Sequence, residues 1–264
     1  MRLYGEVARR SFRRFSTYRA ATFAGVFTNS VFGMIRAAVL VAVVKAAPGT
    51  GDYDVTDVMT FSFITQAMLG FTSMFGAIDE ISQRVRTGDI VCDFYRPSDF
   101  QIWYFAFDAG RATFQLLGRF LPIVVVGQLV YGIQWIDSVG TALLFLVSLY
   151  GALMISFGIR YMVSLSSFWL LDVRGSTQLA VTLMMFGSGN VAPLSFFPDW
   201  LEPVVRALPF AGLVQTPADV WMGKVTGLDA VGTVLVQLGW GAVLFGVGRY
   251  VTLLATRRVV IQGG

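Results

Sequence analysis

Long apolar stretches alternate with short polar intervals along the chain, and six of these stretches are each long enough to cross a bilayer. We therefore predict an all-α membrane protein with six transmembrane helices in one domain, residues 1–264. The first half is predicted to contain an interfacial helix at 1–19, spans one and two within 20–78 and a polar loop at 79–99. A second interfacial helix and spans three and four follow within 100–171. The remaining segments are span five at 175–197, short outer helices at 198–227, span six at 228–254 and a cytoplasmic tail at 255–264.

The first 19 residues combine six arginines with apolar side chains at helical spacing. This pattern predicts a basic amphipathic helix in the headgroup region of a membrane. A signal peptide is the competing interpretation, but the apolar run that follows, 20–44, is longer than the apolar region of a signal peptide. We expect this run to be an uncleaved first span, with Arg36 as its one charged residue.

The interval 79–99 is dense in polar residues and separates the second and third spans. It predicts a short helix over 79–87, because Gly88 can adopt the left-handed conformation that ends a helix and two arginines occupy the last turn. Pro97 prevents a simple helical continuation into the next span. A plain solvated hairpin is the alternative interpretation. A hairpin, however, requires neither the glycine cap nor the aromatic pair Phe94 and Tyr95 that follows it.

Five of the eight prolines fall within 191–224, between the fifth and sixth spans. One short helix fits a start at Asp199, with Glu202 placed for a capping box. A second fits a start at Thr216, with Asp219 in its first turn. Neither helix is long enough to span, so we expect both to lie at the outer interface or to re-enter it.

Two polar stripes follow the predicted helices. The first begins near the junction of an interfacial helix at 100–110 and the third span at 112–131. It consists of Asp108, Arg111, Gln115 and Arg119. We expect this stripe to point at protein or water. The second lies on the fourth helix, which could extend from 137 to 171 with a tilt, a kink or a cytoplasmic extension. Its members are Ser148, Ala152, Ser156, Arg160 and Ser164, and their mostly small side chains favour close helix packing over a substrate path.

The composition agrees with a membrane protein, since 55% of the residues are hydrophobic and 14% are charged. Histidine is absent and Cys92 is the single cysteine, which excludes disulfide frameworks, Cys/His zinc sites and histidine-based catalysis within one chain. Twelve lysines and arginines fall on the side of the termini and three on the opposite side, which predicts that both termini are cytoplasmic. These positions explain the net charge of +4 without a nucleic-acid partner.

Two function classes lack the residues that they need. No G-x-x-x-x-G-K-[ST] motif occurs, so the chain has no phosphate-cradling loop for ATP, and we expect it to bind no cofactor and to be no enzyme. Asp and Glu avoid the centres of the predicted spans, which argues against a secondary transporter coupled to protons or sodium. If the protein is a pump, ATP hydrolysis must take place on another chain.

The order of these features resembles the permease subunits of the ABC-2 transporter family, and most closely the actinobacterial-type branch of about 260 residues. The motifs that carry the resemblance are Tyr18-Arg19-Ala20, Gly88-Asp89-Ile90, Arg96-Pro97, the run from Pro193 to Pro198, Leu208-Pro209-Phe210 and the Val-Ile-Gln-Gly-Gly end. The resemblance implies a type V exporter-like half-channel in a bacterial cell membrane. It also implies a separate ABC ATPase that binds ATP and magnesium, and a second permease that is either the same chain or a paralogue. An amphipathic or lipophilic cargo suits such a path.

The resemblance assigns three groups of residues. The family's polar loop carries a coupling helix that docks on the ATPase, and the contacts expected in this chain are Asp79, Glu80, Gln83, Arg84, Arg86, Asp89, Phe94, Tyr95 and Arg96. Residues expected to line the translocation path are Asn29, Arg36, Gln66, Met68, Met74, Met184, Phe186 and Asn190. The expected outer gate consists of Phe196, Phe197, Trp200 and Trp221. A structural or scaffold membrane protein without a transport role is the alternative, and a secondary transporter is a weaker one.

Overall fold

The computed structural model describes residues 2–75, 78–170 and 172–262, and every regular element in these ranges is a helix. The α-helices are α1 (Arg2–Ser16), α2 (Arg19–Ala46), α3 (Val55–Thr72), α4 (Asp79–Thr87), α5 (Ile90–Phe94), α6 (Phe100–Gln115), α7 (Leu121–Tyr131), α8 (Val139–Leu165), α9 (Arg174–Gly187), α10 (Glu202–Ala207), α11 (Gln215–Trp221) and α12 (Gly227–Gln262). The remaining turns are the π-helical η2 (Leu116–Phe120) and the 3-10 turns η1 (Thr50–Asp52), η3 (Ser166–Phe168), η4 (Leu194–Phe196) and η5 (Pro209–Leu213).

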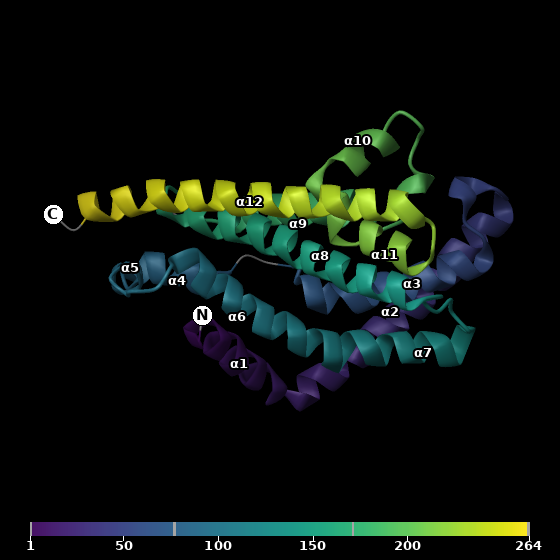
Figure 1. The fold of residues 1–264 in the computed structure, drawn as a ribbon, viewed down its shortest axis with the longest axis horizontal. Coiled ribbons are helices and arrows are strands. Elements are labelled where there is room, and N and C mark those ends of the chain that lie inside the picture. The colour runs from purple at the N-terminus through teal and green to yellow at the C-terminus, as the bar shows by residue number, and fades with distance from the viewer. Residues whose placement is uncertain (1, 76–77, 171, 263–264) are drawn as a thin grey trace.

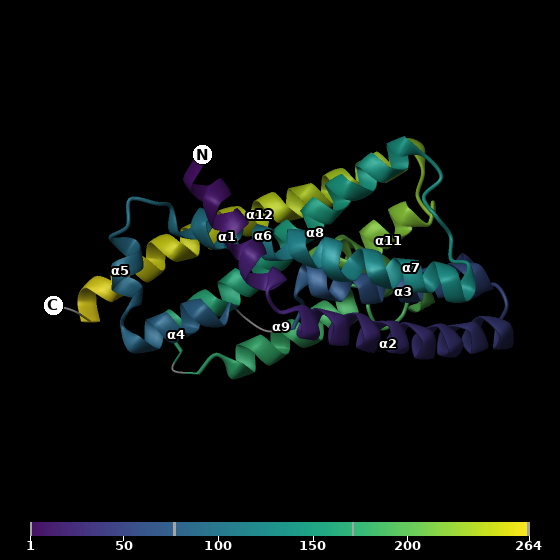
Figure 2. The ribbon, with the colours of Figure 1, turned by 90° about the horizontal axis from the view of Figure 1, so that it is seen from below.

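The long helices form an elongated bundle (Figure 1). Helices α4 and α5 and the C-terminal end of α12 lie at one end of the bundle, whereas α11 and the link between α2 and α3 lie towards the other end. Helices α8 and α12 pack side by side, and α2 follows an outer edge of the bundle (Figure 2). The short helices outside the long bundle therefore fall into two groups, one towards each end.

Helix α3 is the buried centre of the bundle. Thirteen of its 18 residues are buried, and it packs against α2, α6, α7, α8 and α11. Phe61 and Phe63 are fully enclosed, and the hydroxyls of Thr60, Ser62 and Thr72 donate to carbonyl oxygens one turn earlier. The polar side chains of this helix are therefore satisfied inside the protein, so they do not have to face lipid.

Four helices in the described ranges are long and apolar enough to cross a membrane, namely Arg19–Ala46, Phe100–Tyr131, Val139–Phe168 and Gly227–Arg258. They coincide with the first, third, fourth and sixth spans that the sequence predicts. The predicted second span is α3, which is buried and carries several polar side chains among its apolar ones. The predicted fifth span is α9, whose 14 residues extend only about 21 Å against a hydrocarbon core of about 30 Å.

Helix α3 ends six residues before the end that the sequence predicts for the second span, at residue 78. Its last residue is Thr72, and Ser73 follows in the left-handed conformation with φ 51°. Arg111 donates to the carbonyl oxygens of Gly70 and Phe71, at 2.7 and 2.8 Å. A guanidinium from another helix thus caps the C-terminus of α3, a contact that local sequence could not indicate.

Helix α9 also differs from the predicted span, because it ends at Gly187 instead of Phe197. Gly189 has φ 78°, a conformation that leaves the helix, and Pro193 cannot continue it. The chain then turns inwards, where the amide of Gln215 donates to the carbonyl oxygen of Ser188 at 3.0 Å.

The third span lacks the break that the sequence predicts. The helix continues from Phe100 through the π-helical Leu116–Phe120 to Tyr131, so the expected interfacial helix at 100–110 is the first part of one long helix. Arg111, near the expected junction, donates to Asp108 at 2.7 Å. Because this arginine is paired inside the protein, nothing forces the chain to leave the helix there.

The outer helices also begin at different residues from those predicted. Helix α10 begins at Glu202 instead of Asp199, and the expected capping box is absent. The Glu202 carboxylate instead accepts a hydrogen bond from Arg206, at 2.7 Å. Helix α11 begins at Gln215, one residue before the predicted start.

The described residues after 254 are helical where the sequence predicts a tail. Helix α12 continues from Gly227 to Gln262, beyond the predicted end of span six at 254. No proline or glycine interrupts 249–262, so the chain has no local reason to leave the helix. On the fourth helix, α8 with η3 reaches Phe168, and Leu171, at the predicted limit, lies outside the described ranges.

A charged network joins α6, α8 and the end of α3. The Asp108 carboxylate accepts from Arg111 and Arg160, and all three side chains are buried. Arg160 also donates to the hydroxyl of Ser156, which in turn donates to the carbonyl oxygen of Thr72. The two polar stripes therefore point at protein here, as the sequence predicts, and the fourth-helix stripe serves helix packing.

The basic helix α1 lies against α6. A Cβ atom at Gly110 would overlap the carbonyl oxygen of Ala8, so the absence of a side chain allows the two helices to approach this closely. The rings of Phe12 and Phe114 meet edge to face, with centroids 5.7 Å apart. The arginines of α1 are consequently carried on the surface of a helix that is packed onto the bundle.

Candidate functional site

The polar loop contains the helix that the sequence predicts. Helix α4 covers Asp79–Thr87 and ends at Gly88, whose φ of 80° is the left-handed conformation of a C-terminal cap. Its start is fastened to α8, because the amide of Ile78 donates to the hydroxyl of Ser164 at 2.7 Å. Ile81 is fully buried. The loop is thus a short helix anchored on the bundle, which does not match a plain solvated hairpin.

Three of the expected ATPase contacts are used inside the loop itself. Arg84 and Arg96 both pair with the buried carboxylate of Asp93. Burial is the largest single influence on Arg84 and opposes its charge, but the hydrogen bond to Asp93 and the attraction of nearby negative groups together outweigh it and raise the pKa of the guanidinium above its usual value. The ring of Phe94 packs on Phe100, with centroids 4.8 Å apart. These residues hold α4, α5 and the start of α6 in one arrangement.

Most of the other expected contacts face solvent. The exposed members are Glu80, Gln83, Arg86, Asp89 and Tyr95. Tyr95 is 85% exposed, although large aromatic side chains are usually buried. The side chain of Asp79 lies outside the described part of the structure. The loop therefore exposes a polar surface with one large aromatic side chain, Tyr95. The ion pairs of Asp93 with Arg84 and Arg96 hold the backbone beneath that surface in place.

A second group of expected residues meets where α2, α3 and the turn after α9 come together. Arg36 donates to Thr65 on α3 at 2.9 Å and to the carbonyl oxygen of Gly189 at 3.3 Å. Asn29, two turns earlier on α2, donates to the backbone carbonyl of Gln66 at 3.3 Å. The structure thus places Asn29, Arg36 and Gln66 along one seam between two helices.

This seam retains hydrogen-bonding capacity. Among the described residues Arg36 has no carboxylate partner, and its Nε has no hydrogen-bond partner. The Oδ1 atom of Asn190 is likewise buried without a partner in the described ranges. Ionisable groups within membrane spans are rare and usually mark a path for a ligand. The half-buried Arg36 is therefore the strongest single candidate for contact with a polar group of a cargo.

The three expected methionines are placed differently. Met68 belongs to the main hydrophobic core around α3, and Met74 and Met184 share a smaller core with Ile155 and Leu213. All three methionines are at most 1% exposed. In this arrangement they fill the interior of the bundle, and they reach a path only if the surrounding helices separate.

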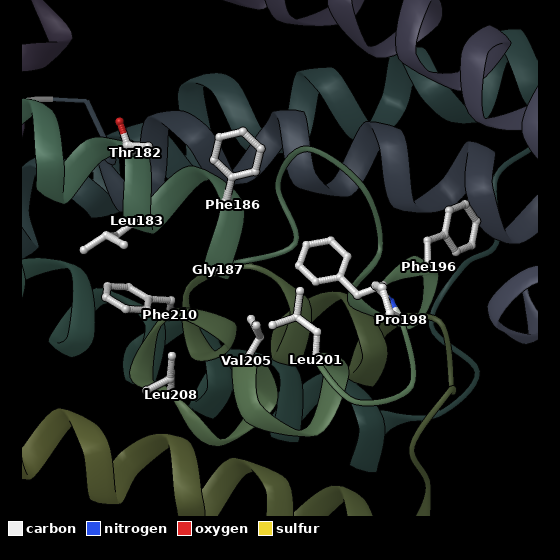
Figure 3. A pocket seen from close by; sticks show the side chains of 11 residues that line it. Thr182, Leu183, Phe186, Gly187, Phe196, Pro198, Leu201, Val205, Leu208 and Phe210 are labelled. Carbon is white, nitrogen blue, oxygen red and sulfur yellow. The ribbon is translucent and has the colours of Figure 1, made fainter.

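Three further expected residues surround one apolar cavity of about 500 Å³ (Figure 3). Phe186 comes from the end of α9, and Phe196 and Phe197 come from the outer segment. The other lining residues are Thr182, Leu183, Gly187, Pro198, Leu201, Val205, Leu208 and Phe210. The structure therefore brings one expected path residue and two expected gate residues to the same cavity. An alkyl chain or another apolar group fits these walls.

The two tryptophans of the expected gate have different surroundings. Trp200 is 73% exposed, whereas Trp221 is 6% exposed. The ring of Trp221 packs edge to face on Phe145, with centroids 4.9 Å apart, and its Nε1 donates to the carbonyl oxygen of Gln134 at 3.0 Å. Trp221 thus fastens the outer segment to the core, and Trp200 projects from it.

The sequence did not predict a buried polar cluster around Asp219 on α11. Asp219 is 3% exposed and accepts hydrogen bonds from Gln215, Arg206 and Tyr53, at 2.7, 3.1 and 3.2 Å. Burial raises the pKa of the Asp219 carboxyl, although Arg206 acts in the opposite direction. The sequence placed Asp219 only in the first turn of a helix. One partner, Tyr53, comes from 166 residues away, so local sequence could not reveal the whole cluster.

The family model described as ABC-2 family transporter protein matches residues 32–263, which is most of the chain. No curated protein matches.

Proposed function

The chain belongs to the ABC-2 family of transporter proteins, and from this premise we propose that it is the permease subunit of an ATP-driven exporter. The family and the apolar helices make the chain a multi-pass membrane protein and a transport component that is not itself catalytic. We propose that α3 and α9 complete a bundle of six spans. We further propose that both termini and the α4–α5 loop face the cytoplasm, an orientation that the excess of lysine and arginine on that side supports.

The observation that carries the proposal is the anchored α4–α5 loop. Its Arg84–Asp93 pair holds α4 to α5. The hydrogen bond from the amide of Ile78 to Ser164 on α8 connects this exposed polar helix to the bundle. A push on this helix by a separate ATPase that closes on ATP and magnesium would be transmitted to α8 and to the end of α3. The N-terminal helix α1, packed on α6, is proposed as a further contact.

We propose that a second permease, either another copy or a paralogue, completes the path. The seam with Arg36 lies beside the outer edge formed by α2, much of which is exposed. A polar arginine in the seam together with the apolar cavity at Phe186 would accommodate an amphipathic or lipophilic cargo. The segment with Trp200 would close the path on the outer side.

Affinity purification of the tagged full-length chain from mild detergent, followed by mass spectrometry, tests the coupling. We expect an ATP-binding subunit to be recovered with the native chain. The triple variant Gln83→Ala, Arg86→Ala and Tyr95→Ala should lose most of it, because these side chains are exposed, and the ion pair of Arg86 with Asp172 is long, at 3.7 Å. Trp200→Ala, an exposed aromatic change on the outer segment, is the matched control and should retain the subunit.

The alternative is a structural membrane protein without a transport role. If no ATP-binding subunit co-purifies under any nucleotide condition, the exporter proposal fails and this alternative takes its place. Recovery of a second permease in the same experiment would distinguish a paralogue from a homodimer.

A further inference from the structure

A polar cavity of about 340 Å³ lies between α4 and the start of α9. Helix α4 contributes Ser82, Gln83 and Arg86, and the opposite wall consists of Val173, Arg174, Thr177 and Gln178. These seven lining residues include two arginines, two hydroxyls and two side-chain amides, and no carboxylate. The walls therefore offer hydrogen-bond donors and positive charge, which suit an anion.

Ser82 provides an observation that is independent of the charges. Its side chain is 5% exposed, and its Oγ has no hydrogen-bond partner in the described ranges. A buried hydroxyl without a hydrogen-bond partner lowers the stability of the fold by about 1–3 kcal/mol. Most buried polar side chains in native proteins therefore have a partner. A ligand oxygen in the cavity would accept the hydrogen bond that Ser82 otherwise lacks.

The opposite wall is the N-terminus of a helix of 14 residues. The first turn of such a helix presents amide hydrogens without intrahelical partners and the positive end of the helix dipole. Arg174, the first residue of α9, lines the cavity, and its side chain is 86% exposed. Amide donors, the dipole and an exposed guanidinium together form a common anion-binding arrangement.

Asp172 shows how an anion is held at this position. Its carboxylate accepts from the amide of Arg174 at 2.9 Å, and it lies 3.7 Å from Arg86 and 3.8 Å from the Arg174 guanidinium. Both side-chain distances exceed those of a close charge-assisted hydrogen bond, about 2.7–2.9 Å. The two arginines therefore retain donors for a second anion, and the three groups carry a net charge of +1.

We propose that this cavity binds a phosphate-type oxyanion, and that the phosphate belongs to the headgroup of a membrane phospholipid. The lipid is the source that the geometry favours, because α9 begins here and only Met184 among its 14 residues is buried. Exposed apolar side chains such as Leu179 and Leu183 leave acyl chains access to the rest of the helix. The position at the inner leaflet depends on the orientation given under the proposed function.

A lipid in this cavity would connect two elements that the described residues link by one long ion pair, Arg86 with Asp172. Its phosphate would contact Ser82 and Arg86 on α4 and Arg174 on α9 at the same time. The coupling helix and the fifth span would then be linked by a ligand whose supply depends on the composition of the membrane.

Native mass spectrometry of the full-length chain tests the site, because it counts bound lipids directly. The chain is released from nanodiscs of phosphatidylcholine with and without phosphatidic acid. Phosphatidic acid should remain bound to the native chain. Arg174→Gln should weaken this binding about tenfold, and Ser82→Ala severalfold, because each removes a donor to the phosphate.

Arg257→Gln is the matched control, since Arg257 is also exposed, lies near the end of α12 on the proposed cytoplasmic side, and does not line the cavity. It should leave binding unchanged. A parallel measurement in detergent uses inorganic phosphate. Phosphate binding that depends on Arg174, without lipid binding, would uphold the oxyanion site and overturn its lipid source.

Equal binding by the native chain, Arg174→Gln and Ser82→Ala would overturn the whole inference. These measurements contain no ATPase, so their failure is distinct from failure of the exporter proposal. Both variants change surface or cavity positions, and a melting curve equal to that of the native chain shows that they are folded.

Discussion

The two ends of the molecule both carry short helices outside the long bundle, yet the interactions that hold them differ. In the α4–α5 loop, the ion pairs of Asp93 with Arg84 and Arg96 form the frame, and much of the α4 surface is exposed. At the outer end, all seven residues of α11 are buried. The first end therefore keeps a free polar surface on a fixed frame, which suits a partner, and the second is built into the core. Changes at the outer end should cost stability, and changes at the loop surface should cost binding.

The largest effect is expected at the outer end, from Trp221→Ala. This change should reduce the free energy of unfolding by about 3–5 kcal/mol, because it empties a site packed between Phe120 and Phe145 and removes the donor to Gln134. Thermal unfolding of the purified chain in detergent measures the loss. Trp200→Ala, the exposed counterpart, should change stability by no more than about 0.5 kcal/mol. Similar losses for both tryptophans would contradict the difference drawn between them.

A smaller effect is expected in the α4–α5 loop, from Asp93→Ala. The change leaves Arg84 and Arg96 without their shared carboxylate and should destabilise the loop by about 2–3 kcal/mol. Hydrogen exchange of the amides in 79–96 should become faster, while the transmembrane helices keep their protection. Glu80→Ala, at an exposed position of the same helix, is the control. Unchanged exchange in Asp93→Ala would show that the ion pairs do not form the frame of the loop.

The smallest effect compares two glycines in polar helices. Gly88→Ala should cost about 1 kcal/mol, because φ at this position is 80° and a Cβ atom disfavours that conformation. Gly5→Ala should instead stabilise α1 by about 0.5–1 kcal/mol, since Gly5 lies inside a helix with open space around it. Melting temperatures in the same detergent reveal the sign of each change. Equal signs would refute the conformational explanation.

Local signals in the sequence were sufficient for the helix of the polar loop and for the first span. Gly88 directly follows the short polar helix, and a glycine there readily adopts the left-handed conformation that ends a helix. This local signal is enough to specify the end of α4. The first span reaches from Arg19 to Ala46, close to the predicted 20–44, because a long apolar run with one charge has few other stable conformations.

The candidate site was predictable in part. Arg36, Asn29 and Gln66 were among the expected path residues, and the structure brings them to one seam. It also named Phe186 and Phe196, which line one cavity. The internal role of Arg84 could not be predicted, because whether an arginine faces a partner or its own loop depends on where Asp93 lies in space.

The sequence alone determined that the chain is an all-helical membrane protein with a short capped helix in a polar loop, because hydrophobic runs and cap residues act over a few neighbouring positions. The tertiary structure alone decided where α3 ends and which polar groups are buried together. The physical reason is that each of these outcomes depends on a partner distant in the chain. Arg111 caps α3 from 40 residues away, and Tyr53 reaches Asp219 across 166 residues.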